Sequence, residues 1–158
     1  NITSGASTGG TAFVRVTSAG NVGIGSTAPR QKLDIAGSIE IGSTYSSSSG
    51  VIFNNGCRFI HNFSHPTGGG AVPWGLNTFV GVDAGNFTMG STATFAYNSS
   101  KNTGVGTSAL SAETTGNSNT AVGYQALSAN TSGSQNTAIG ENALSGNTSG
   151  TVNPAVGS

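Results

Sequence analysis

Five carboxylates are the side chains of this 158-residue chain that could carry out acid–base chemistry: Asp34, Glu40, Asp83, Glu113 and Glu141. Enzymes that cleave polysaccharides use a pair of carboxyl groups on either side of the scissile bond. No two of these carboxylates are close in the sequence, and Glu141 occupies a position that Thr107 and Tyr124 hold in sister copies of a repeat. We therefore predict no catalytic residues, and we interpret Glu141 as a solvated side chain.

His61 and His65 lie four residues apart in a segment rich in Pro and Gly. On a helix this spacing could bind zinc, but the segment is not helix-like and no third ligand is evident. We predict no metal and no cofactor, and interpret both histidines as loop or interface residues; the alternative is that a symmetry axis gathers three copies of one His around an ion. The single Cys57 excludes an internal disulfide and is interpreted as a small buried hydrophobic residue.

The chain has one tryptophan, Trp74, in an irregular stretch between more regular segments. It could stack on a sugar ring, or it could plug the end of a stacked repeat structure; we favour the plug. Irregular loops on a rigid scaffold are where binding residues tend to lie. The candidate receptor-binding residues, from residues 61–75 and 89–100, are Trp74, His61, His65, Phe95 and Tyr97.

The composition indicates a β-structure with many tight turns. Only 6% of residues are charged and 34% are hydrophobic, and the formal net charge is zero. Five basic residues without a cluster predict no nucleic-acid binding, and no apolar run approaches the roughly 20 residues of a membrane span, so we predict no membrane insertion. Gly and Asn tolerate positive φ and recur in register with β-branched residues, which favours ordered turns over disorder.

The elements that must position these side chains follow from a 17-residue repeat. The run at Asn102–Gly106 recurs at Asn119–Gly123, at Asn136–Gly140 and at Asn153–Gly157. A short, strict period predicts a solenoid in which each repeat is one coil. We therefore predict an all-β fold, a parallel β-roll or β-solenoid with 17-residue coils, preceded by short β-strands and hairpins, with almost no helix.

Three regions are predicted. Residues 1–42 form a β-strand segment with one isolated repeat motif at 21–28. Residues 43–76 form a connector with a hairpin about Asn55-Gly56, the strongest short-range hairpin signal. Residues 77–158 form the β-roll, whose first copy lies 25 residues before the second because of an insertion at about 89–100.

Stacking of coils predicts ladders of identical side chains. We expect Val105, Val122 and Ile139, with the leucines Leu110, Leu127 and Leu144, to lie inside the roll or along a seam between subunits. Thr107, Tyr124 and Glu141 should face solvent, and the repeated asparagines should form a hydrogen-bonded ladder at a corner. Each coil offers only about three aliphatic side chains, at roughly 1.5–3 kcal/mol each, against roughly 1–2 kcal/mol lost per ordered residue. The chain is therefore expected to associate with copies of itself.

The Asn-Thr-Ala-Val-Gly and Asn-Thr-Ala-Ile-Gly runs resemble the head repeats of trimeric autotransporter adhesins, which implies a homotrimer of parallel β-rolls. Residues 20–39 are similar to a segment of phage-tail-fibre-like proteins of the kind that carry an endosialidase-type C-terminal chaperone. Together the two resemblances cover residues 20–41 and 77–157.

We therefore expect a structural or adhesive segment of a homotrimeric extracellular fibre, on a cell or virion surface, that binds a host glycan or protein receptor. The chain is interpreted as a piece of a longer protein. The alternatives are a fibre-borne carbohydrate-active enzyme and a self-assembling filament subunit whose rolls stack end to end through unpaired coil edges.

Overall fold

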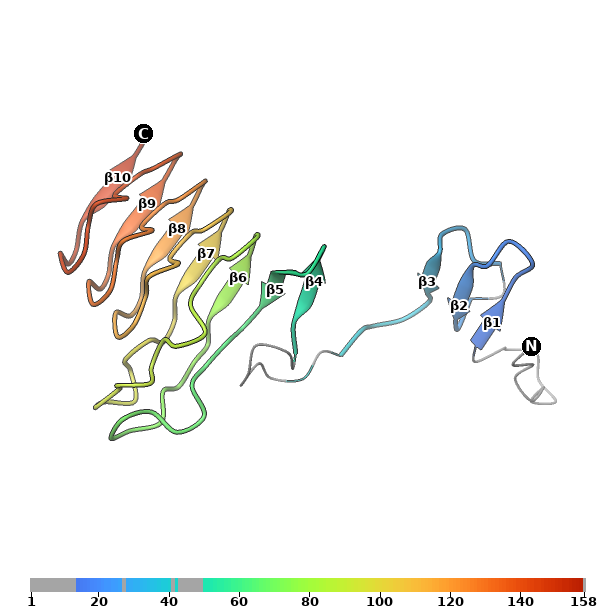
Figure 1. Ribbon diagram of the computed structural model, residues 1–158, viewed down its shortest axis with the longest axis horizontal. Helices are drawn as coiled ribbons and strands as arrows, with labels where there is room; N and C mark the ends of the chain where they lie inside the picture. The colour runs from blue at the N-terminus through green and yellow to red at the C-terminus, as the bar shows by residue number, and fades with distance from the viewer. Residues whose placement is uncertain (1–13, 27, 41, 43–49, 158) are drawn as a thin grey trace. The chain divides into compact units, whose positions relative to one another are not determined.

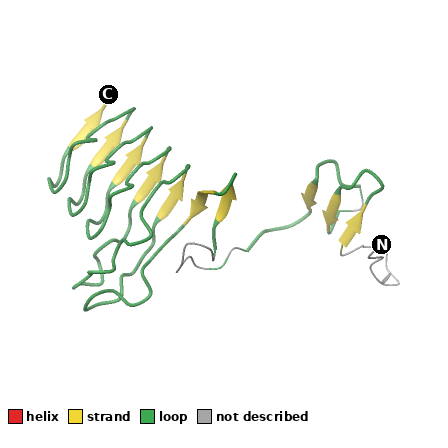
Figure 2. Cartoon of the chain, viewed as in Figure 1, coloured by secondary structure: helices red, strands yellow, loops and turns green. Residues whose placement is uncertain are grey.

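The computed structural model describes residues 14–26, 28–40, 42 and 50–157. The chain forms two compact units, Asn1–Glu40 and Ile41–Ser158, which are described separately. Strands joined by turns and loops account for the described part of both units, and no helix occurs in it, as predicted (Figure 2).

The first unit contains a three-stranded sheet in the order β1-β2-β3. Strand β1 (Val14–Val16) pairs antiparallel with β2 (Val22–Ile24), and β2 pairs in parallel with β3 (Leu33–Ile35). The expected strand at 11–17 is thus present over its described residues. The expected strand pair or bulged strand at 33–41 is wrong beyond Ile35, because no strand occurs at 36–40 and Ile39 is exposed.

The second unit is a seven-stranded sheet in the order β10-β9-β8-β7-β6-β5-β4 (Figure 1). Strand β4 (Ile52–Asn54) and β5 (Cys57–His61) form the predicted hairpin, with Asn55 at φ 50° and Gly56 at φ 80°. Both central turn residues therefore have the positive φ that an Asn-Gly turn of this kind requires. Strand β5 pairs antiparallel with β6 (Thr78–Val80).

From β6 onward all neighbouring strands are parallel, an arrangement compatible with a β-solenoid. Strands β7 (Thr103–Val105), β8 (Thr120–Val122), β9 (Thr137–Ile139) and β10 (Pro154–Val156) pair at a constant offset of 17 residues. Strand β6 pairs with β7 in the same frame at an offset of 25 residues, with Thr78 opposite Thr103. The eight extra residues therefore lie outside the strand ladder.

The middle residue of each short strand points into the unit. Phe79, Ala121 and Ala138 are fully buried, whereas the residues on either side of them face outward or are half-buried. Phe79 fills the interior where its neighbours are small: a Cβ on Gly104 would lie 2.9 Å from the Phe79 ring, and one on Gly85 2.8 Å. The interior of each coil is thus narrow, because most of its positions fit only Gly or Ala.

The recurring leucines complete this core. Leu110 and Leu127 are fully buried, as predicted, and Leu144 is partly buried against the same cluster. All three have left-handed backbone, with φ between 50° and 55°. Such a conformation costs a non-glycine residue of order 1 kcal/mol or more and persists only where the surroundings impose it. Burial of the leucine side chain, roughly 1.5–3 kcal/mol, offsets that strain.

The predicted asparagine ladder is present and links successive coils. Asn102, Asn119 and Asn136 are fully buried. The backbone N–H of each donates to the side-chain oxygen of the asparagine one coil earlier, at 2.8 to 3.0 Å, and Asn153 continues the series. Each amide nitrogen donates in turn to a glycine carbonyl, as from Asn119 to Gly133 at 2.8 Å. The ladder therefore satisfies buried backbone groups at the corner of each coil.

The expectation that Val105, Val122 and Ile139 lie inside the roll is wrong. They are 36–43% exposed, on the outer face of the sheet. The reason is the length of the strands: with three residues per strand, only the middle one points inward, and alternation sends the aliphatic residue outward. Thr107, Tyr124 and Glu141 face solvent, as predicted.

Candidate functional site

The aromatic residues chosen as candidates for receptor binding lie on two neighbouring segments, 69–76 and 93–101. The backbone N–H of Trp74 donates to the Ala96 carbonyl at 2.7 Å, and that of Lys101 donates to Gly75 at 2.7 Å. Ala96 stands between Phe95 and Tyr97 in the chain. The structure therefore brings the Trp74 segment alongside the insertion that carries the other two aromatic residues.

These three side chains form an exposed surface, here named the aromatic platform (Trp74, Phe95 and Tyr97). Their exposed fractions are 58%, 57% and 45%. The rings of Phe95 and Tyr97 stack in parallel, with centroids 5.2 Å apart and planes 4° apart. The exposure of Trp74 contradicts its interpretation as a plug, because a plug would be covered by the coil that it closes.

One cation accompanies the platform. The Lys101 ammonium lies 5.1 Å from the centroid of the Trp74 ring, within range of a cation–π interaction. Among the described residues the ion pair is instead Arg58–Asp83, at 3.4 Å, so Lys101 has no carboxylate partner there. The sequence from residue 84 to 112 contains no Asp or Glu. The platform therefore carries a net positive charge.

His61 is not on this surface. It is buried against the rings of Phe79 and Phe87, at centroid distances of 4.9 and 4.6 Å. Its Nε2 lies 2.8 Å from the Ala84 carbonyl, which can only accept, and its Nδ1 accepts from the backbone N–H of Phe63 at 3.3 Å. Both ring nitrogens are thus engaged within the chain. Burial lowers the pKa of His61, and the nearby Arg58 lowers it further, so the ring is neutral with its proton on Nε2.

His65 organises the loop that precedes the platform. Its Nδ1 accepts from the backbone N–H groups of Thr67 and Gly68, at 3.3 and 3.0 Å. The structure does not bring its ring together with that of His61 around a common point. Among the described residues, no group of three or more His, Cys, Asp or Glu side chains could hold a metal ion. Cys57 is half-buried rather than buried.

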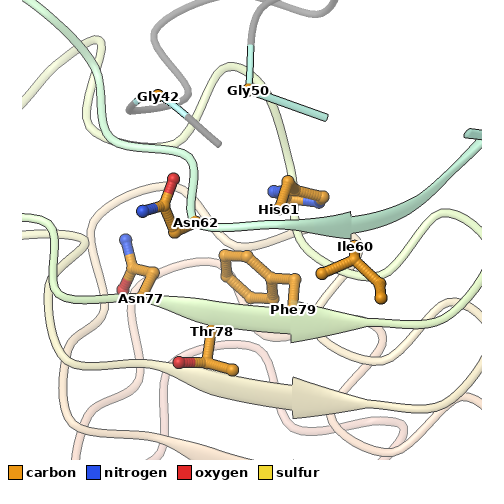
Figure 3. A pocket seen from close by; sticks show the side chains of 8 residues that line it. All are labelled: Gly42, Gly50, Ile60, His61, Asn62, Asn77, Thr78 and Phe79. Carbon is orange, nitrogen blue, oxygen red and sulfur yellow. The ribbon is translucent and has the colours of Figure 1, made fainter. Parts of the chain in front are cut away.

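A cavity of about 210 Å³ lies at the β5–β6 end of the second unit (Figure 3). Its lining includes His61, Asn62, Asn77 and Phe79. The Asn77 amide nitrogen already donates to the carbonyls of Phe63 and Ser99, at 2.9 and 2.8 Å. With His61 engaged as well, these two polar groups stabilise the coil rather than wait for a ligand.

A second outward surface, here named the aliphatic row, crosses all seven strands of the sheet. Direct Cα pairing in six consecutive strand pairs places seven β-branched residues in one line. The row consists of Ile52, Ile60, Val80, Val105, Val122, Ile139 and Val156. Six of the seven are at least about a third exposed, and Val80 is half-buried. At about 4.8 Å per strand, the row is roughly 29 Å long.

The most unusual titratable group is Glu113, which the sequence did not single out. Glu113 is fully buried, and its Oε2 accepts from the amide nitrogens of Asn130, at 2.7 Å, and Asn119, at 3.2 Å. Its Oε1 has no hydrogen-bond partner among the described residues. Burial raises the pKa of this carboxyl to about 7, although the hydrogen bonds to its charged form act in the opposite direction. The available signal was the repeat position, which Asn130 and Asn147 hold in the following coils.

Comparisons with family models, curated proteins and solved structures find no match to this chain. None of the described segments forms a helix with the length and apolar character needed to span a bilayer. The site is therefore argued from its own geometry, which offers an exposed aromatic platform and an exposed aliphatic row.

Proposed function

We propose that this chain is a structural and adhesive segment of a homotrimeric extracellular fibre. Its second unit forms a β-solenoid of 17-residue coils that gives the fibre length and rigidity, and its irregular loops bind a receptor on a host or other surface. The aliphatic row is the observation that carries this proposal, since an apolar stripe of this length on a monomer marks an interaction surface.

A second copy of the same chain is the partner that fits the row. Each coil adds one aliphatic side chain per strand spacing, and a copy of the chain presents the same side chains at the same spacing. Stacked copies can therefore pack side chain against side chain along the entire row. An unrelated globular surface has no reason to match this period. The number of three subunits comes from the resemblance of the Asn-Thr-Ala-Val-Gly runs to trimeric adhesin heads.

The carboxylates support a role other than catalysis. Within the second unit, Asp83 pairs with Arg58, Glu113 is enclosed in the asparagine ladder, and Glu141 is an exposed side chain of the repeat. Hydrolysis of a polysaccharide by two carboxyl groups requires them to flank one bond. We propose accordingly that the segment binds without transforming its ligand.

The proposal is tested by the oligomeric state of the chain and of Val122→Asp. The parent is expected to sediment as a trimer at micromolar concentration. Val122→Asp should dissociate it while leaving the coils folded, because Val122 lies on the outer face and Ala121 fills the interior. Sedimentation velocity gives the mass, and far-ultraviolet circular dichroism gives the fold.

Tyr124→Asp is the matched control, because Tyr124 is exposed in the same coil but lies outside the row. It should remain trimeric. A folded parent monomer at micromolar concentration contradicts the proposal. A size distribution that grows without limit as concentration rises supports the filament alternative.

A further inference from the structure

The aromatic platform has the properties of a built surface rather than of stray exposed side chains. Its rings belong to the one part of the coil stack that departs from the 17-residue offset, so the surface does not recur along the solenoid. Val72 and Leu76 are also exposed, at alternate positions on either side of Trp74, whereas Pro73 and Gly75 between them are buried. The segment thus directs its apolar side chains to solvent and its small residues to the interior.

Hydrogen bonds hold the platform in place before any ligand arrives. The side-chain oxygen of Asn98 accepts from the backbone N–H groups of Thr94 and Phe95, at 3.1 and 3.0 Å. Its amide nitrogen donates to the Thr115 carbonyl of the next coil, at 3.3 Å. The Ala93 carbonyl accepts from three successive N–H groups of residues 69–71. Little conformational freedom of the backbone remains to be lost on binding, which favours affinity.

The charge and shape of this surface select the ligand class. Exposed aromatic faces pack against the C–H faces of pyranose rings, and the polar edges of Trp and Tyr hydrogen-bond to hydroxyl groups. Lys101 supplies a positive charge beside Trp74 with no carboxylate partner among the described residues. One lysine is too few to follow a nucleic-acid backbone. A second copy of the chain is matched to the aliphatic row, whereas this platform does not repeat.

We propose that Trp74, Phe95 and Tyr97, together with Lys101, bind an acidic polysaccharide, with sugar rings against the aromatic faces and a sugar carboxylate at the Lys101 ammonium. This inference rests on the proposed function, because it names the ligand of the adhesive segment. Trp74 is the only tryptophan of the chain, so the intrinsic fluorescence of the protein reports directly on this position.

The experiment compares tetragalacturonate with its fully methyl-esterified form, which keeps the same rings and removes the charge. Tetragalacturonate is expected to shift the Trp74 emission and to bind at least about fivefold more tightly than the ester. Lys101→Gln should abolish that preference and leave binding of the ester unchanged. Gln is a suitable replacement because Gln135 holds the equivalent position, at φ 59° against 61° for Lys101.

Trp74→Ala and Phe95→Ala, measured by calorimetry, should each weaken binding of both ligands by at least about fivefold. Tyr124→Ala is the matched control, because it removes an exposed aromatic ring far from the insertion in sequence and should bind as the parent does. Circular dichroism and melting temperature verify that each variant is folded.

Equal binding of the acid and the ester overturns the assignment of an acidic ligand. Binding of tetragalacturonate that survives Trp74→Ala and Phe95→Ala overturns the platform as the site, and absence of binding to the parent overturns the inference as a whole. Sedimentation of the same samples distinguishes these outcomes from failure of the proposed function, because a trimer without sugar binding remains a fibre segment.

Discussion

At the scale of single residues, Glu113 places an ionisable group where the repeat otherwise has an amide. Asn130 and Asn147 continue the same column: the Asn147 amide nitrogen donates to the Asn130 side-chain oxygen at 3.0 Å, and Asn130 donates to Glu113 at 2.7 Å. Glu113 is therefore the terminal acceptor of a polar column inside the coil. A charge at this point is costly, because Oε1 lacks a partner among the described residues.

This arrangement makes stability depend on pH. Burial raises the folded-state pKa of Glu113 from 4.5 to about 7, so between these values the folded chain holds a proton that the unfolded chain has released. Stability should therefore fall as pH rises from about 4.5 to 7 and then level off. The contribution of this group is on the order of 3 kcal/mol. Glu113→Gln should remove most of the slope and be more stable than the parent at pH 8.

Thermal melts of the parent and of Glu113→Gln between pH 4.5 and 8.5 measure this effect. Glu141→Gln is the control, since Glu141 is exposed in the following repeat and should leave the profile unchanged. Parallel profiles for the parent and Glu113→Gln would show that the carboxyl is not the source of the dependence.

At the scale of elements, the coils are held by turns that most residues adopt only under strain. Gly106, Gly123 and Gly140 have φ between 133° and 139°. A Cβ at Gly123 would lie 2.2 Å from the carbonyl oxygen of Gly140 in the next coil. These glycines therefore serve both the backbone angle and the close contact between coils.

Gly123→Ala should destabilise the chain by roughly 3 kcal/mol or more, because it combines a disfavoured φ with an overlap against backbone. Gly146→Ala is the matched control. A Cβ there meets nothing within 4 Å, and Ala112 and Ala129 hold the equivalent positions. That change should instead stabilise by about 0.4–1 kcal/mol through the unfolded state. Chemical denaturation of the two variants decides the matter, and comparable losses in both would refute the assigned packing.

The elements were predictable from sequence where a local rule determined them. Asn55-Gly56 marked a hairpin, and the repeated asparagines predicted a ladder, because each signal depends only on residue type and period. The direction of Val122 was not predictable in the same way. Its β-branched side chain suits an inner or an outer position equally, and only the three-residue strand with Ala121 at its centre decides between them.

The candidate site was predictable only in part, for a similar reason. Phe95, Tyr97 and Trp74 were marked by their break from the repeat, and exposure then separated them from His61. Composition could not reveal that His61 packs between two phenylalanine rings, because those contacts come from segments that are distant in sequence. Glu113 escaped notice because a lone acid in a polar repeat resembles surface decoration until burial is known.

At the scale of the whole molecule, the two outward surfaces of the second unit divide its work. The aliphatic row is periodic and continues through every strand of the sheet, so its capacity for association grows with the number of coils. The aromatic platform occurs once, at the insertion. Lengthening the solenoid should therefore strengthen assembly while leaving the number of ligand sites per chain unchanged.

The constant offset between β7 and β10 has a consequence for how such a chain can change in length over generations. Because each coil contacts only its neighbours, removing residues 119–135 brings Asn136 into the position of Asn119 and lets β9 pair with β7. That deletion should yield a folded chain with a lower melting temperature. Removing one residue fewer, 119–134, exchanges inward and outward side chains in every later strand and should abolish cooperative melting. Viable variants should therefore gain or lose whole coils, in steps of 17 residues.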